Sequence, residues 1–130
     1  MLDACNLIFM PQRLGQHFLK NKSAIKTMLD ALDVQSGDTI LEIGPGHGVL
    51  TLPLVERCAE KKCRVVAVEK DATLTQEVRS KIQELGLQEV VEVVHGDVLA
   101  VLTSYILPLT SYKLAGNLPY YISGALLRLI

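Results

Sequence analysis

The sequence predicts an α/β fold built on a doubly wound parallel sheet, and three observations lead to this prediction. Short apolar, β-branched runs at 39–43, 64–68 and 90–94 are typical of strands that are buried on both faces. Longer stretches separate these runs, and such alternation favours parallel strands joined by right-handed crossovers. The chain has 130 residues, 49% of them hydrophobic, which is enough for one domain with a packed core.

The first helix is expected over 22–33, after Asn21, which is a suitable N-cap. Gly37 and Asp38 then turn the chain into the strand at 39–43. The helix should cover one face of the sheet, because its apolar residues recur at helical spacing: Ile25, Met28, Leu29 and Leu32.

Two more helices are expected between the strands. The first begins within 49–52 and extends to about Glu60, because Pro53 is tolerated only in the first turn of a helix. The second follows Asp71, a good N-cap, and ends before Gly86, which can adopt the left-handed conformation.

A fourth strand is expected at 112–115, ending at Asn117. It follows a poorly patterned connection over 98–110, and Ser123 can cap a last helix. The chain contains no repeat and no low-complexity segment.

The overall charge carries no signature of nucleic-acid binding, because 13 Lys and Arg oppose 14 Asp and Glu and the net charge is -1. The stretch 13–26 is basic and lacks acidic residues, so it is a candidate for phosphate contact. An ordinary solvated helix face explains it equally well. Its basic residues are Arg13, Lys20, Lys22 and Lys26.

No metal site and no disulfide are predicted. The cysteines are odd in number and lack the paired spacing of zinc ligands, and the histidines lie far from one another. These residues are Cys5, Cys58, Cys63, His17, His47 and His95.

Residues 1–10 do not match a secretory signal, because they include Asp3 and no basic leader. A cytoplasmic protein without a membrane partner is therefore expected. Met10 immediately precedes the first recognisable motif, so 1–10 is interpreted as an N-terminal extension without a structural role.

A glycine loop follows the strand at 39–43. Residues 42–48 read Glu-Ile-Gly-Pro-Gly-His-Gly, whereas the NAD fingerprint GxGxxG would need its third glycine at Val49. The pattern is instead ExGxGxG, which resembles the loop of S-adenosylmethionine-dependent methyltransferases. Gly44 and Gly46 are therefore candidate cofactor contacts. Glu42 lies within the strand and is expected to be mainly buried and to brace the loop.

Acidic residues stand at the ends of the next two strands. Glu69 lies 21 residues beyond Gly48, where a carboxylate can accept from both ribose hydroxyls of a cofactor. Asp97 follows the third strand and can accept from an adenine amine. The alternative for each is a helix cap or a turn former. Special residues at consecutive strand ends favour a ligand site over this alternative.

A tetrapeptide near the end of the sequence predicts a reaction at the nitrogen of a planar amine. It reads Asn117-Leu118-Pro119-Tyr120. The exocyclic amine of adenine is a poor nucleophile, because its lone pair is delocalised into the ring. The Asn117 side-chain oxygen and the Leu118 carbonyl can accept from its two N–H groups. Pro119 fixes the turn, and Tyr120 can stack on an extruded base. The alternative is a turn followed by packing at a helix start.

Together with Leu14-Gly15-Gln16-His17-Phe18-Leu19, these motifs resemble the ribosomal RNA adenine N6,N6-dimethyltransferase family over roughly residues 11–130. The resemblance implies a Rossmann-like class I methyltransferase fold with S-adenosyl-L-methionine as cofactor. It also implies adjacent adenosines of small-subunit (16S) rRNA, or of a pre-ribosomal particle, as substrate, each methylated twice at N6. His17 stands where many members have Asn. The implied cofactor contacts are His17, Leu19, Gly44, Gly46, Glu69, Asp97 and Asn117, and the implied catalytic residues are Asn117, Leu118, Pro119 and Tyr120.

Family members continue with further strands and a small helical domain that contributes to RNA binding. Residues 11–130 are therefore interpreted as the N-terminal part of the catalytic domain, truncated after about four strands. We expect an unpaired edge at the fourth strand, little catalytic activity of this chain alone, and a monomer at full length.

Two alternative functions stay open. A large-subunit (23S) rRNA adenine methyltransferase of the antibiotic-resistance type more often has Ile at the position of Leu118. A non-catalytic nucleic-acid-binding relative would keep the fold without turnover, and the intact residues Glu69, Asn117 and Tyr120 disfavour it.

Overall fold

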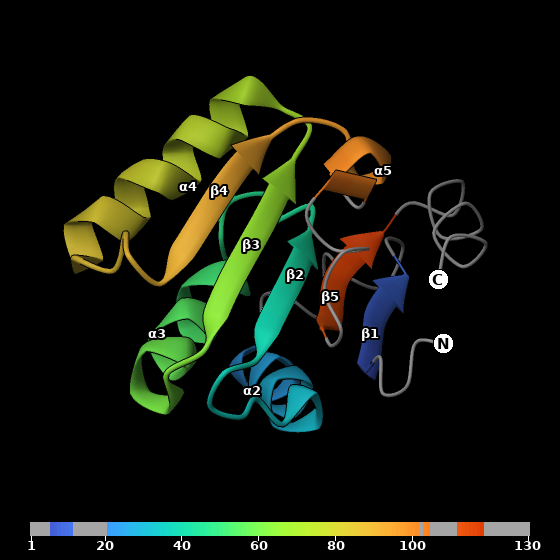
Figure 1. Ribbon diagram of the computed structural model, residues 1–130, viewed down its shortest axis with the longest axis vertical. Helices are drawn as coiled ribbons and strands as arrows, with labels where there is room; N and C mark the ends of the chain where they lie inside the picture. Colours follow the sequence, from blue (N-terminus) through green and yellow to red (C-terminus); the bar gives the residue numbers. More distant parts are fainter. Residues whose placement is uncertain (1–5, 12–20, 102, 105–111, 119–130) are drawn as a thin grey trace.

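The computed structural model describes residues 6–11, 21–101, 103–104 and 112–118, and Figure 1 shows how their elements are arranged. Helices and strands alternate from α2 onward, as the sequence predicts except at 98–101, where a short helix lies within the expected connection. The elements are β1 Asn6–Pro11, α2 Lys22–Leu32, β2 Thr39–Ile43, α3 Thr51–Lys61, β3 Arg64–Glu69, α4 Ala72–Leu85, β4 Val91–His95, α5 Val98–Val101 and β5 Lys113–Leu118.

The five strands form one parallel sheet in the order β1-β5-β2-β3-β4. From β2 the chain proceeds outward through β3 to β4, and it then returns to the other side of β2 to form β5 (Figure 1). The direction of strand addition therefore reverses between β2 and β5. In an open α/β sheet, ligands bind at such a reversal, beyond the carboxyl ends of the strands.

Both faces of the sheet are buried, which explains why its strands are almost continuously apolar. Helices α2, α3 and α4 pack on one face through a cluster that includes Leu29, Leu32, Ile40, Leu54, Val65 and Val78. The opposite face carries a second cluster, to which α5 contributes, and this cluster includes Leu41, Ile43, Val66, Val68, Val98 and Leu114. The predicted doubly wound α/β fold is confirmed.

Local signals place the helix ends as predicted. The Asn21 side chain accepts from the amide of Ser23 at the start of α2, and the Asp71 carboxylate caps α4 in the same way. Gly86 ends α4 with φ 67°. Pro53 lies in the first turn of α3, and strand β4 begins one residue later than expected.

Strand β1 corrects two predictions. Residues 6–11 form a strand of the sheet, so the interpretation of 1–10 as an extension without a structural role is wrong for this segment. β1 pairs with β5 from Asn6 opposite Lys113 to Pro11 opposite Leu118. The predicted unpaired edge at the fourth strand is therefore also wrong, because β5 lies between β1 and β2. A short apolar run does not reveal from its own residues that its partner lies at the other end of the chain.

A disulfide joins Cys58 to Cys63, where none was predicted. Lys62 follows α3 in the left-handed conformation, and the Cys63 amide then donates to the Cys58 carbonyl at 3.0 Å. This return of the chain brings the two Cα atoms to 4.7 Å, within the usual range for a disulfide. The sequence criterion missed the pair because it considered CxxC spacing and not the geometry of a helix C-terminus.

Candidate active site

The glycine loop and Asn117 meet at the reversal of the strand order. Gly44 directly follows β2, and its amide donates to the Val68 carbonyl of β3 at 2.9 Å. On the other side of β2, Ile43 is in register with Gly116 of β5. The backbone of Asn117 is therefore next to the start of the loop, and the topology brings together two motifs that are about 70 residues apart in the sequence.

Glu69, the last residue of β3, holds the glycine loop. Its Oε1 accepts from the Gly46 amide at 3.0 Å, and its Oε2 accepts from the Asp71 amide at 2.9 Å. The side chain is buried, with 7% of the residue exposed. Each carboxylate oxygen has two acceptor positions, so these bonds leave capacity for two further donors. Glu69 and Gly46, both predicted site residues, are thus in direct contact.

Asp97 stands at the next strand end, and its backbone is tied to the same region because the Gly96 amide donates to the Glu69 carbonyl at 2.9 Å. The Asp97 side chain accepts from the Leu99 amide at 2.8 Å, at the start of α5. This contact matches the alternative interpretation of Asp97 as a helix cap. The predicted contact of Asp97 with adenine stays a prediction.

Glu42 is almost fully buried beneath the loop, with 1% of the residue exposed. Ala67 and Ala115 are its register partners on the neighbouring strands, and their small side chains leave room for the carboxyl group. Burial raises the pKa of Glu42 to about 7, and the Glu69 carboxylate raises it further. Among the described residues, Glu42 Oε2 and Thr51 Oγ1 have no hydrogen-bond partner.

Glu42→Gln is expected to stabilise the protein increasingly as pH rises. The pKa of Glu42 is about 7 in the folded protein against 4.5 ordinarily, so the folded state retains a proton that the unfolded state loses between these values. Wild-type stability therefore falls as pH rises from 4.5 through 7, and glutamine, which is isosteric and uncharged, removes this loss. Between pH 5 and pH 8, the advantage of the variant in unfolding free energy should grow by about 2 kcal/mol.

Urea denaturation at the two pH values checks this expectation. Glu92→Gln is the matched control, since the Glu92 carboxylate pairs with Arg64 at 2.8 Å at the surface. An advantage of Glu42→Gln that is the same at pH 5 and pH 8 would show that the pKa of Glu42 is not raised in the folded protein.

Several predicted site residues lie outside the described residues. These are His17 and Leu19 of the N-terminal arm, and Pro119 and Tyr120 of the tetrapeptide. Asn117 and Leu118 are placed through the backbone of β5 alone.

Gly116 is a site residue that the sequence analysis missed. A Cβ atom at this position would overlap the carbonyl oxygen of Ile43 and would lie 3.1 Å from the Ile43 amide nitrogen. The absence of a side chain thus allows β5 to approach β2 closely, directly before Asn117. A glycine inside a strand is a recognised sign of close backbone approach, so the signal was present in the sequence.

The described ranges contain neither a membrane-spanning helix nor a metal-binding cluster. No helix there is long and apolar enough to cross a membrane. No group of three or more His, Cys, Asp or Glu residues in the same ranges could hold a metal ion.

Comparison with known proteins identifies close relatives by sequence. The family described as "Ribosomal RNA adenine dimethylase" matches residues 10–130. "Ribosomal RNA small subunit methyltransferase A" of Dichelobacter nodosus is 39% identical over 116 residues, which cover 89% of this chain and 41% of that protein. The protein of the same name from Geobacter metallireducens is 39% identical over 117 residues, covering 88% and 40%. The chain thus spans about two fifths of the length of these curated relatives.

Solved structures show the same fold. An RNA methyltransferase from Salinibacter ruber, in complex with S-adenosyl-L-homocysteine, matches with a TM-score of 0.68 at 22% identity, over 84% of this chain and 66% of its own. A SAM-dependent O-methyltransferase from Thermotoga maritima matches with a TM-score of 0.54 at 27% identity, over 59% and 29%. Since the family match covers nearly the whole sequence and the predicted motifs lie within it, this chain belongs to the ribosomal RNA adenine dimethylase family.

Proposed function

We propose that this chain carries the cofactor-binding half of the active site of an enzyme that transfers methyl groups from S-adenosyl-L-methionine to N6 of adenosines in small-subunit (16S) rRNA. The product is dimethyladenosine, and the setting is ribosome biogenesis in the cytoplasm. The observation that carries the proposal is the contact between Glu69 and the Gly46 amide at the strand-order reversal, in a chain of the ribosomal RNA adenine dimethylase family.

The described residues fit this cofactor. Gly44, Gly46 and Gly48 all have positive φ, so the loop can present its backbone closely to a ligand. The remaining acceptor positions of Glu69 suit two ribose hydroxyls, and Asp97 at the next strand end suits an adenine amine. The orphaned Glu42 Oε2 is a further polar atom beneath the loop. When bound, the cofactor supplies a methyl group carried on a sulfonium.

The tetrapeptide supplies the acceptors for the target amine. The Asn117 side-chain oxygen and the Leu118 carbonyl accept from the two N–H groups of adenine N6, and Tyr120 stacks on the extruded base. An amide is not a general base near neutral pH. After methyl transfer the nitrogen is transiently cationic and gives up its proton to water, and the two oxygens stabilise that charge more than they stabilise the neutral amine.

Cofactor binding by the 130-residue chain is the first test. S-adenosyl-L-homocysteine at a hundredfold excess over its Kd should raise the free energy of unfolding by about 2.7 kcal/mol, because it binds the folded state alone. The shift is measured by thermal unfolding, and the Kd by calorimetry. NAD at the same concentration should give no shift. If the homocysteine derivative also gives none, the proposed cofactor is wrong.

Methyl transfer is tested with labelled S-adenosyl-L-methionine and unmethylated small subunits. Label should appear on N6 of adenosine, at a rate far below that of a full-length relative, since the chain spans about two fifths of such a protein. Label on a ribose oxygen or a ring carbon would contradict the proposed chemistry. Transfer at the rate of a full-length relative would refute the expectation that this chain alone has little activity.

A further inference from the structure

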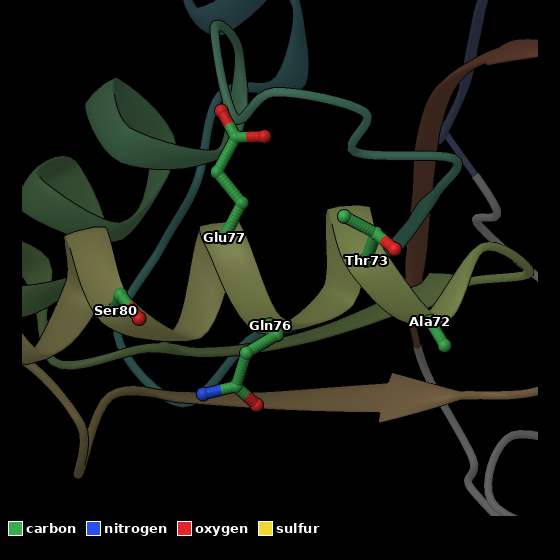
Figure 2. Close-up of a pocket in the computed structure, with 5 residues that line it drawn as sticks. All are labelled: Ala72, Thr73, Gln76, Glu77 and Ser80. Carbon is green, nitrogen blue, oxygen red and sulfur yellow. The ribbon is translucent and has the colours of Figure 1, made fainter.

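The outer side of the glycine loop is attached to helix α4. Lys81 Nζ donates to the His47 carbonyl at 2.7 Å and to Glu77 Oε1 at 2.9 Å. His47 Nδ1 lies 3.0 Å from Glu77 Oε1 and 3.1 Å from Oε2. Figure 2 shows the Glu77 side chain extending from α4 on the opposite side of the helix from Gln76, toward the adjoining loop. His47, Glu77 and Lys81 thus form one connected group, which we call the loop clamp.

The loop clamp is more than an ordinary ion pair along a helix. Glu77 and Lys81 are spaced i,i+4, and such pairs are common on exposed helix faces. Here both side chains also reach residue 47, which is 30 and 34 positions away in the sequence. The pKa of the Glu77 carboxyl is lowered by the hydrogen bonds from Lys81 and His47, in keeping with this geometry. The clamp therefore links α4 to the loop.

The glycine content of the loop makes its ordering costly in conformational entropy. Gly44, Gly46 and Gly48 have φ values of 68°, 58° and 87°, and glycine loses more backbone freedom on ordering than any other residue. Glu69 holds the inner side of the loop through the Gly46 amide at 3.0 Å. Lys81 holds the outer side through the His47 carbonyl, one residue further along. The peptide groups 45–46 and 47–48 are thus each held by a neighbouring element, the first by β3 and the second by α4.

We propose that Glu77 and Lys81 are positioning residues that keep the glycine loop in the shape that accepts the cofactor. This inference rests on the proposed cofactor function. A loop that is already ordered loses less conformational entropy when a ligand binds, so the clamp raises affinity without touching the ligand. Because the clamp lies at the surface, with about a third of the Glu77 and Lys81 side chains exposed, its contribution is modest.

Lys81→Met is the variant that tests the clamp, because methionine keeps the apolar stem and removes the donor. The Kd for S-adenosyl-L-homocysteine, measured by calorimetry on the 130-residue chain, should rise about three- to tenfold. Amide hydrogen exchange over 44–48 should become faster in the ligand-free protein. The unfolding temperature without ligand should stay close to that of wild type. Lys81→Arg, which retains a donor, should restore affinity.

Lys26→Met is the matched control. It removes the Lys26–Asp30 pair of α2, which has the same i,i+4 spacing and a 2.8 Å distance. Its Kd should equal that of wild type. If wild type binds and Lys81→Met binds equally well, the clamp inference fails and the proposed function stands. If wild type does not bind, both fail. The positioning role would also be overturned by a different result. In that result Lys81→Met loses affinity and unfolds at a lower temperature without ligand, and Lys81→Arg restores neither.

Discussion

Gly116→Ala is expected to lower the free energy of unfolding by about 3 kcal/mol, because the added methyl group has no room to enter. Its Cβ would overlap the Ile43 carbonyl oxygen, and the Ile43 carbonyl carbon would lie 3.2 Å away. These are backbone atoms of the paired strand β2, so relief requires β2 and β5 to separate and not merely a side chain to turn. For a domain of this size, the unfolding temperature should fall by roughly 10 °C, measured by circular dichroism.

Gly96→Ala is the control for this substitution. Among the described residues, a Cβ at Gly96 would meet only the Val101 side chain, at 3.9 Å, which is ordinary van der Waals contact. The control should therefore change the unfolding temperature little. Equal unfolding temperatures for Gly116→Ala and wild type would mean that β5 can move away from Ile43 at no cost. In that case the close approach would not fix the position of Asn117.

The elements that could be predicted from the sequence are those with local signals. Asn21, Asp71 and Gly86 mark helix ends through bonds to residues within a few positions, and the apolar period of α2 lies within a single segment. Strand β1 carries no comparable signal, because its only partner in the described sheet is β5. Pairing between chain ends depends on the whole topology, and a short apolar run does not encode it.

In the candidate site, too, features with local signals could be predicted from the sequence and contacts between distant segments could not. Glu69 was predicted because its distance from the glycine loop and its place at a strand end are visible in the sequence. Its bond to the Gly46 amide was not predicted, since it joins the end of β3 to the glycine loop across 23 residues. Lys81 and Glu77 were missed altogether, because their i,i+4 spacing is common on solvated helices and nothing in it indicates the loop. Side-chain contacts between elements therefore had to come from the structure.

Glu69→Ala is expected to weaken the binding of S-adenosyl-L-homocysteine by about a hundredfold or more. The substitution removes the acceptors proposed for two ribose hydroxyls, and hydrogen bonds to a charged group contribute about 1.5–3 kcal/mol each. It also leaves the Gly46 and Asp71 amides without their carboxylate partner, so the loop loses its inner attachment. The loss should therefore exceed that of Lys81→Met, which removes only the outer attachment.

Calorimetry on Glu69→Ala, Glu69→Gln and a Glu92→Ala control separates these contributions. Glutamine retains an acceptor oxygen without the charge, so its affinity should lie between those of wild type and Glu69→Ala. Glu92 lies on the adjacent strand and pairs with Arg64, so its removal should leave the Kd unchanged. If Glu69→Ala binds as tightly as the control, then neither the free acceptors of Glu69 nor its bond to the loop contributes to binding. The ribose would in that case have to be recognised by other residues. The proposal that residues at the strand ends bind the cofactor would then lose its main support.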